Sequence, residues 1–354
     1  MTHTLTDDSP IALASGIDRT LGLFGYDPSG FAFASTTPSL ATGASGAWDD
    51  YFVRDLSVPV DSSGHPVKVL TALQALYFGG RTQTGSAQLG MATSGDGGKT
   101  WQRYAGNPVV SASGVSGSWR QYGVSSTGCL YESGTYYLYA AGWNGTTWAA
   151  IGLLTSPDLI TWTDQGSLLT LSQFQDGANT ILTIGNTTIV KTAAGVYTLL
   201  FEGYANATPP SLWRIWGATA SSAAGPFTPI NSGQPLLTGT AGTWTAHGVS
   251  NPCLIEAIAG SFILAHAGWD GSQVGRIGLE TSTDLLNWAP YTGNPVLSSD
   301  SQSWRSLELE PTCLFKGASE QWRLIYNGYN SSGLPQVGLA QSPQANNAFP
   351  IVSG

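Results

Sequence analysis

Short stretches of alternating apolar and polar residues recur along the chain, and each ends where a glycine stands beside an aromatic residue. Such a period of two is typical of a β-strand with one buried face. No stretch has the pattern of a long helix. The alternation therefore predicts five equivalent strands, at residues 73–80, 136–143, 196–204, 262–269 and 322–329.

A second pattern follows each of these strands, an apolar-Gly-apolar run that leads into a turn closed by an aromatic residue. Residues 277–288 repeat residues 151–162 almost letter for letter, and residues 89–101 are a third copy. Two decayed copies lie at 215–227 and 337–349. Short strands of this kind stack around an axis to bury their faces. The sequence thus predicts an all-β fold, a five-bladed β-propeller of four-stranded antiparallel blades.

A tryptophan opens the module before these strands, and a Cys-Leu pair follows it in three copies. The pairs are Trp119 with Cys129, Trp244 with Cys253, and Trp304 with Cys313. Because the cysteines recur at one place in different blades, they are predicted to be small, buried, unpaired strand residues that do not meet. Since no Cys-x-x-Cys spacing occurs, neither a metal site nor a cofactor is expected.

The module begins near residue 48, so the chain divides into an N-terminal arm, residues 1–47, and the propeller, residues 48–354. The net charge of −9, with 13 Lys and Arg in total, argues against a nucleic-acid partner. No apolar run is long enough to span a membrane. The first residues lack the pattern of a signal peptide. The composition favours an extracellular protein that leaves its cell by a route other than signal-directed secretion. A homo-oligomer is an open alternative.

The order of strands and the Gly-Asn-Pro-Val turns at 106–109 and 293–296 resemble the five-bladed β-propeller glycosidases of the arabinanase, xylosidase and invertase type. The resemblance implies a glycan as partner. It also implies a pair of catalytic carboxylates that flank the scissile bond, with a third carboxylate that tunes them. In that family the carboxylates project into the central channel from the first strands of different blades.

Two first strands carry charge where the aligned strands carry small polar residues. Arg54 and Asp55 break the pattern in the first blade, and Glu310 breaks it in the last. Glu308 lies two residues earlier, so it shares a strand face with Glu310, and two close carboxylates raise one pKa. Glu310 is thus predicted to be the acid and Asp55 the base or nucleophile. The alternative for Asp55 is a turn cap.

Glu308 and Glu310 have a structural alternative, which is an ion pair with Arg305 or Arg54. Glu202 is a further candidate, because it stands before the glycine of a second strand that is otherwise apolar. It is either the third carboxylate or the partner of Arg214, since a buried carboxylate needs a partner.

Residues with a predicted role in substrate binding are Arg54 beside the carboxylates, His247 in the fourth blade, and aromatic residues at the blade rims that can stack on sugar faces. The predicted aromatic contacts are Trp143, Trp269 and Tyr329.

Two departures favour an alternative function. The third blade begins at Asp176 without the Glu-Gly-Pro or Glu-Ser-Pro motif of the arabinanase type. In the arm, residues 21–30 resemble short strings in bacteriophage tail and fibre proteins. These features imply a non-catalytic virion module, a tail fibre, spike or decoration, whose arm binds other virion proteins. The simpler alternative is that the arm adds a strand to the last blade and latches the ring.

Overall fold

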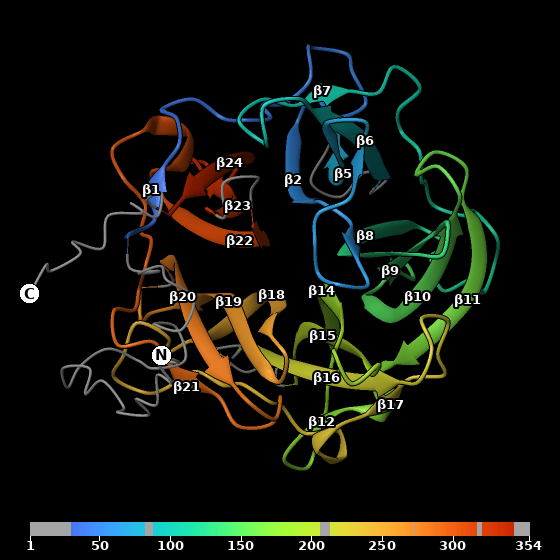
Figure 1. Ribbon diagram of the computed structural model, residues 1–354, viewed down its shortest axis with the longest axis vertical. Coiled ribbons are helices and arrows are strands. Elements are labelled where there is room, and N and C mark those ends of the chain that lie inside the picture. Colours follow the sequence, from blue (N-terminus) through green and yellow to red (C-terminus); the bar gives the residue numbers. More distant parts are fainter. Residues whose placement is uncertain (1–29, 82–87, 206–212, 273, 317–320, 343–354) are drawn as a thin grey trace, which may run out of the picture.

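The strands of the protein form a closed ring of five small antiparallel sheets, as the computed structural model shows (Figure 1). The described residues are 30–81, 88–205, 213–272, 274–316 and 321–342. The predicted five-bladed propeller is confirmed, and each blade is built on four strands. Within these ranges, no helix has the length and apolar character needed to cross a bilayer.

The first two blades follow the chain from the axis outward. The first contains β2 (Phe52–Ser57), β5 (Ala72–Gly80), β6 (Gln88–Ser94) and β7 (Gln102–Arg103), with β4 (Lys68–Val69) paired to β5. The second contains β8 (Gly123–Glu132), β9 (Thr135–Trp143), β10 (Trp148–Ser156) and β11 (Thr163–Thr170). In addition, β3 (Val60–Asp61) from the first blade pairs in parallel with β8, which ties the two blades together at the axis.

The third and fourth blades repeat this order. The third contains β14 (Thr183–Lys191), β15 (Tyr197–Tyr204), β16 (Arg214–Ala220) and β17 (Thr228–Pro229). The fourth contains β18 (Gly248–Ile258), β19 (Ser261–Trp269), β20 (Gly275–Ser282) and β21 (Ala289–Pro290). The third blade does not begin at Asp176, which lies in a separate hairpin of β12 (Gln175–Asp176) and β13 (Asn179–Thr180). Short 3-10 helices lie outside the sheets at η2 (Leu171–Gln173), η3 (Asn231–Gly233) and η4 (Ser303–Arg305).

The fifth blade joins both ends of the described chain. It contains β22 (Glu308–Lys316), β23 (Trp322–Tyr329) and β24 (Pro335–Gln341), and its outer strand is β1 (Ala32–Phe33). Ala32 pairs with Gln341 and Phe33 with Ala340. A part of the segment assigned to the arm therefore closes the ring, while residues 1–29 lie outside the described residues.

The repeated spacing of tryptophan and glycine within the module has a direct structural cause. In the fourth blade, a Cβ on Gly268 or Gly278 would lie 2.2 Å or 2.4 Å from the Trp244 ring. The indole lies flat over two neighbouring strands, so those strands need glycine beneath it. The same contact recurs for Trp48 on Gly79 and Gly90, Trp119 on Gly142 and Gly152, and Trp304 on Gly328 and Gly338.

Asparagine and aspartate side chains fix the turns between the outer strands. Asn294 accepts a hydrogen bond from the Leu279 backbone at 2.8 Å and donates one to it at 2.8 Å. Asp284 accepts from the backbone N–H groups of Leu286 and Asn287. Such side chains replace missing backbone partners in a turn. The repeated motifs of the outer strands are therefore scaffold.

Every first strand lines the axis and carries a break in its pairing register with the second strand. The breaks lie between Arg54 and Ser57 in β2 and between Ser250 and Cys253 in β18, with related breaks in β8, β14 and β22. A bulge of this kind bends the strand and changes the direction of its side chains. The axial ends of the blades are therefore irregular where the sheets converge.

The three cysteines lie beyond these breaks, buried and unpaired as predicted. The expectation that they stay apart needs correction, because all three line one small axial cavity of about 30 Å³. Equivalent positions on inner strands point at the same axis, so residues in different blades converge there. Burial raises the pKa of each thiol.

Candidate functional site

A cavity of about 1150 Å³ opens on the ring axis, at the end where the first strands begin. All five first strands contribute side chains to it, and the rims of the second, third and fourth blades add aromatic and amide groups. A hollow of this size fits a small organic ligand such as a short glycan. Its lining from the first strands is Phe52, Arg54, Ser125, Thr183, Ile184, Gly185, Asn186, Ser250, Asn251 and Glu310.

Asp55 lies behind this cavity and not in its lining. Its side chain is fully buried, and its backbone has a φ of 54° at the bulge of β2. Arg54 Nε donates to Asp55 Oδ2 at 2.7 Å. The carboxylate therefore points into the protein, where Arg54 balances its charge. The alternative of a capped loop turn is wrong for this residue, because it lies within β2.

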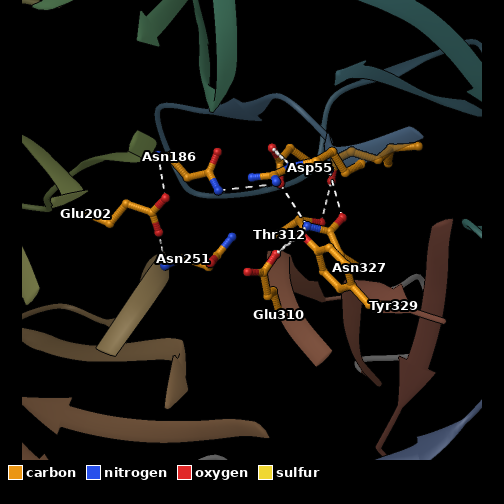
Figure 2. Close-up of polar contacts among 10 residues, drawn as sticks. Asp55, Asn186, Glu202, Asn251, Glu310, Thr312, Asn327 and Tyr329 are labelled. Atoms are coloured by element: carbon orange, nitrogen blue, oxygen red, sulfur yellow. Dashed lines mark hydrogen bonds and ion pairs between the residues drawn. The ribbon is translucent and has the colours of Figure 1, made fainter. Parts of the chain in front are cut away.

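Asn327 of β23 connects Asp55 to Glu310. Its Nδ2 donates to Asp55 Oδ1 at 2.8 Å and to Glu310 Oε2 at 3.1 Å, while its Oδ1 accepts from the Asp55 backbone N–H at 2.8 Å. The side chain of Asn327 is fully buried. One amide thus holds two carboxylates and fixes the unusual backbone of Asp55 (Figure 2).

Glu310 lines the cavity and is 7% exposed. The Tyr329 hydroxyl donates to its Oε2 at 2.7 Å. Burial raises the pKa of Glu310, and Asp55 adds to this, while Arg54 acts in the opposite direction. Glu308 does not line the cavity, and burial followed by the charge of Glu310 raises the pKa of Glu308 to about 8.

The two arginines proposed as ion-pair partners of these glutamates bind other residues. Arg305 pairs with Asp300, at 2.7 Å between Nη2 and Oδ2. Arg54 pairs with Asp55. Burial alone lowers the pKa of Arg54, but the Asp55 carboxylate and the other anionic groups around it raise that pKa above its ordinary value.

Glu202 faces Glu310 across the axis from β15 of the third blade (Figure 2). It is 5% exposed, and it accepts hydrogen bonds from the backbone N–H groups of Asn186 and Asn251. Burial raises the pKa of Glu202 to about 8, and the charge of Glu310 contributes to the rise. The alternative partner Arg214 is bound to Asp176 instead. Glu202 is therefore a buried carboxyl that forms no ion pair with any described residue.

Asn251 of β18 is a site residue that the sequence reasoning missed. It is 3% exposed, it lines the cavity, and its Nδ2 has no hydrogen-bond partner in the part of the chain that the structure describes. In the view of Figure 2, its side chain lies between those of Glu202 and Glu310. A buried N–H donor without a partner is costly, so it marks a place for a ligand acceptor. The only signal in the sequence was a small polar residue at an aligned position.

The predicted substrate contacts divide into two groups. Arg54, Trp143 and Trp269 line the cavity, and Trp269 Nε1 donates to Ser250 Oγ at 2.8 Å. The structure places Tyr329 and His247 outside the lining. Tyr329 is 7% exposed and contacts Glu310, and His247 bonds through its backbone N–H to the Trp269 carbonyl.

Other aromatic and amide side chains complete the wall. Trp148, Phe78 and Tyr122 join Trp143 on the side of the first and second blades, and Trp213 lies in the third. Trp143 and Trp148 contact each other with ring centroids 5.4 Å apart. Over the part of the chain described, no group of three or more His, Cys, Asp or Glu residues is arranged to hold a metal ion.

The arrangement combines two carboxyls of raised pKa with an aromatic wall and amide donors. A carboxyl that keeps its proton near neutral pH can donate it to a leaving group, and a neighbouring carboxylate can act as base or nucleophile. Aromatic faces and amides suit sugars, which have apolar C–H faces and many hydroxyl groups.

Comparison with known proteins identifies the fold. No family model matches the sequence. No curated protein matches it either. The structure is similar to a glycoside hydrolase, with a TM-score of 0.69 at 13% identity, over 92% of this chain and 95% of that one. A glycosyl hydrolase from Bacteroides ovatus has a TM-score of 0.66 at 16% identity, over 88% and 94% of the two chains.

A third similar structure is a β-1,2-mannobiose phosphorylase from Listeria innocua in complex with β-1,2-mannobiose. Its TM-score is 0.59 at 10% identity, over 88% of this chain and 96% of that one. The chain therefore has the glycosidase-like propeller fold that the sequence predicted. The resemblance of residues 1–47 to bacteriophage proteins gains no support from these comparisons and stays a prediction.

Proposed function

We propose that the protein is a carbohydrate-acting propeller that binds a glycan in the axial cavity and hydrolyses a glycosidic bond there. The observation that carries the proposal is that Glu202 and Glu310, both with raised pKa values, line the same cavity from different blades. The fold shared with glycoside hydrolases supports it. One of these similar proteins was determined with a bound disaccharide.

The acid in this proposal is Glu202. With a pKa of about 8, Glu202 is mainly protonated at neutral pH. As the bond between the anomeric carbon and the leaving oxygen breaks, the leaving oxygen takes the proton of Glu202. This assignment replaces Asp55 and Glu310 as the reacting pair, because Asp55 is fully buried and does not line the cavity.

Glu310 is the second carboxyl and acts as a carboxylate. Arg54, Tyr329 and Asn327 all favour its charged form. Water adds its hydroxyl to the anomeric carbon, and Glu310 takes the remaining proton. A glycosyl ester on Glu310, released later by water, is the retaining route of the same pair. Asp55 holds Arg54 and Asn327 in place, so it is a positioning residue.

The experiment is a hydrolysis assay on arabino-, xylo-, fructo-, galacto- and manno-oligosaccharides, with products and their anomers followed by NMR. Glu202→Gln and Glu310→Gln should each lower kcat about 10²-fold or more, because each removes acid or base assistance. Glu256→Gln is the control, since Glu256 lies on β18 and caps backbone N–H groups outside the cavity. It should leave kcat unchanged.

A wild-type protein that binds these glycans and hydrolyses none of them would contradict the proposal and favour a binding module. A virion attachment role for residues 1–47, and a place outside a cell or on a virion surface, are proposals of their own. Deleting residues 1–20 should then leave glycan binding intact and impair incorporation into particles. Unchanged incorporation would refute the attachment role.

A further inference from the structure

We infer that the reactants of the axial site are uncharged: a neutral glycan, anchored by a hydroxyl or ring oxygen on Asn251, with water and not inorganic phosphate as the acceptor. The inference rests on the proposed function for the reaction, and on the charges and donors of the cavity for its selectivity.

The cavity has no free cation among the described residues that line it. Arg54, Glu202 and Glu310 are the charged members of the lining. Arg54 already donates to the buried Asp55 at 2.7 Å, and its side chain is 29% exposed. Sites for carboxylate or phosphate groups need cations in excess, usually arginine in a bidentate geometry. Here Asp55 neutralises the single guanidinium.

An anionic ligand in the cavity would lie near carboxyl groups on both sides. Glu310 lies near enough to Arg54 to affect its pKa, and Glu202 faces Glu310. Inorganic phosphate carries between one and two negative charges at neutral pH. Its approach to the anomeric carbon would bring its negative charge towards the Glu310 carboxylate, whereas a water molecule brings no charge.

One donor at the cavity is a buried neutral amide. Asn251 lines the hollow, its Nδ2 is buried with no partner among the described residues, and its backbone N–H donates to Glu202. A sugar hydroxyl or ring oxygen would satisfy this donor beside the carboxyl pair. A site that is built to hydrogen-bond one group of a substrate discriminates strongly when the bond is lost.

Asn251→Asp tests the anchor with little change in shape. Asn251 has a φ of 51°, a conformation that asparagine and aspartate both tolerate. The variant replaces the donor by an anionic acceptor, so kcat/KM for the neutral glycan should fall about 10²-fold or more. Asn231→Asp is the control, because Asn231 also has a φ of 51° but is exposed and lies outside the cavity. If Asn251→Asp does not fold, Asn251→Gly removes the same donor and tolerates the backbone.

Selectivity is measured on the Glu310→Gln protein by calorimetry, with a neutral oligosaccharide and its uronic-acid counterpart of the same linkage. Tighter binding of the neutral glycan is expected. In the wild type, added phosphate should leave the rate unchanged and yield no sugar 1-phosphate. Preferred binding of the uronic acid, a sugar 1-phosphate product, or full affinity of both Asn251 variants would overturn the inference. Tighter binding of the neutral glycan without any hydrolysis would contradict only the proposed function.

Discussion

At the scale of single residues, charge that breaks a repeat was the informative signal. Glu310 and Glu202 stood out in the sequence for this reason, and both line the cavity. The direction of Asp55 was not predictable, because the bulge that turns it inward depends on a local φ of 54°. Asn251 and Asn327 were missed, since neutral amides at aligned positions look like ordinary variation in a repeat.

Asn327 is expected to position Glu310. It donates to Glu310 and Asp55 at once, and three other blades have Ala141, Ala267 and Phe78 at its place, so an apolar side chain fits there. Asn327→Ala removes a donor that favours the carboxylate, so the pKa of Glu310 rises further. The acidic limb of the kcat/KM profile should move to higher pH. A lower rate with an unmoved profile would indicate a structural role only.

The stability of the fold should depend on pH through Glu202. Its pKa of about 8 in the folded protein exceeds the unfolded value of about 4.3. Between these values the folded state binds more protons, so the free energy of unfolding falls as pH rises from about 4.3 to 8. Thermal unfolding should show a falling Tm over this window. Glu202→Gln should make the fall less steep, and an equally steep fall in the variant would contradict the shift.

At the scale of elements, the strands were predictable because each module repeats its burial pattern. The second strands predicted at 136–143 and 322–329 match β9 and β23 closely. The outer strand of the fifth blade was harder to assign, because β1 comes from the opposite end of the sequence. Pairing between distant segments leaves no periodic signal in either one. The latch considered for the arm accounts for this strand.

Gly278 tests the contact between tryptophan and glycine that organises each blade. A Cβ there would lie 2.4 Å from the Trp244 ring. Gly278→Ala should therefore lower the free energy of unfolding by about 1–3 kcal/mol, as overpacking does. Gly271→Ala is the control, because no atom of the described residues lies within 4 Å of its added Cβ. Denaturant unfolding of both variants is the measurement, and equal stability would refute the contact.

At the scale of the whole molecule, the ring explains why the site is irregular and the blades are not. The outer strands repeat their turns and glycines, whereas the first strands differ where they meet at the axis. The sequence was enough to predict five blades from repetition. It was not enough to assign the reacting pair, since the distance between residues of different blades depends on closure of the ring. Glu202 and Glu310 come together only in the closed structure.

The most direct test of this pair compares two leaving groups on the sugar that the wild type hydrolyses. The aryl group of an aryl glycoside leaves without help from an acid. Glu202→Gln should therefore lose about 10²-fold or more in kcat on the oligosaccharide and little on the aryl glycoside. Glu310→Gln should lose activity on both, because it removes the base or nucleophile. Two results would contradict the account. One is that the aryl glycoside restores the activity of Glu310→Gln but not that of Glu202→Gln. The other is that Glu202→Gln loses equal activity on both substrates.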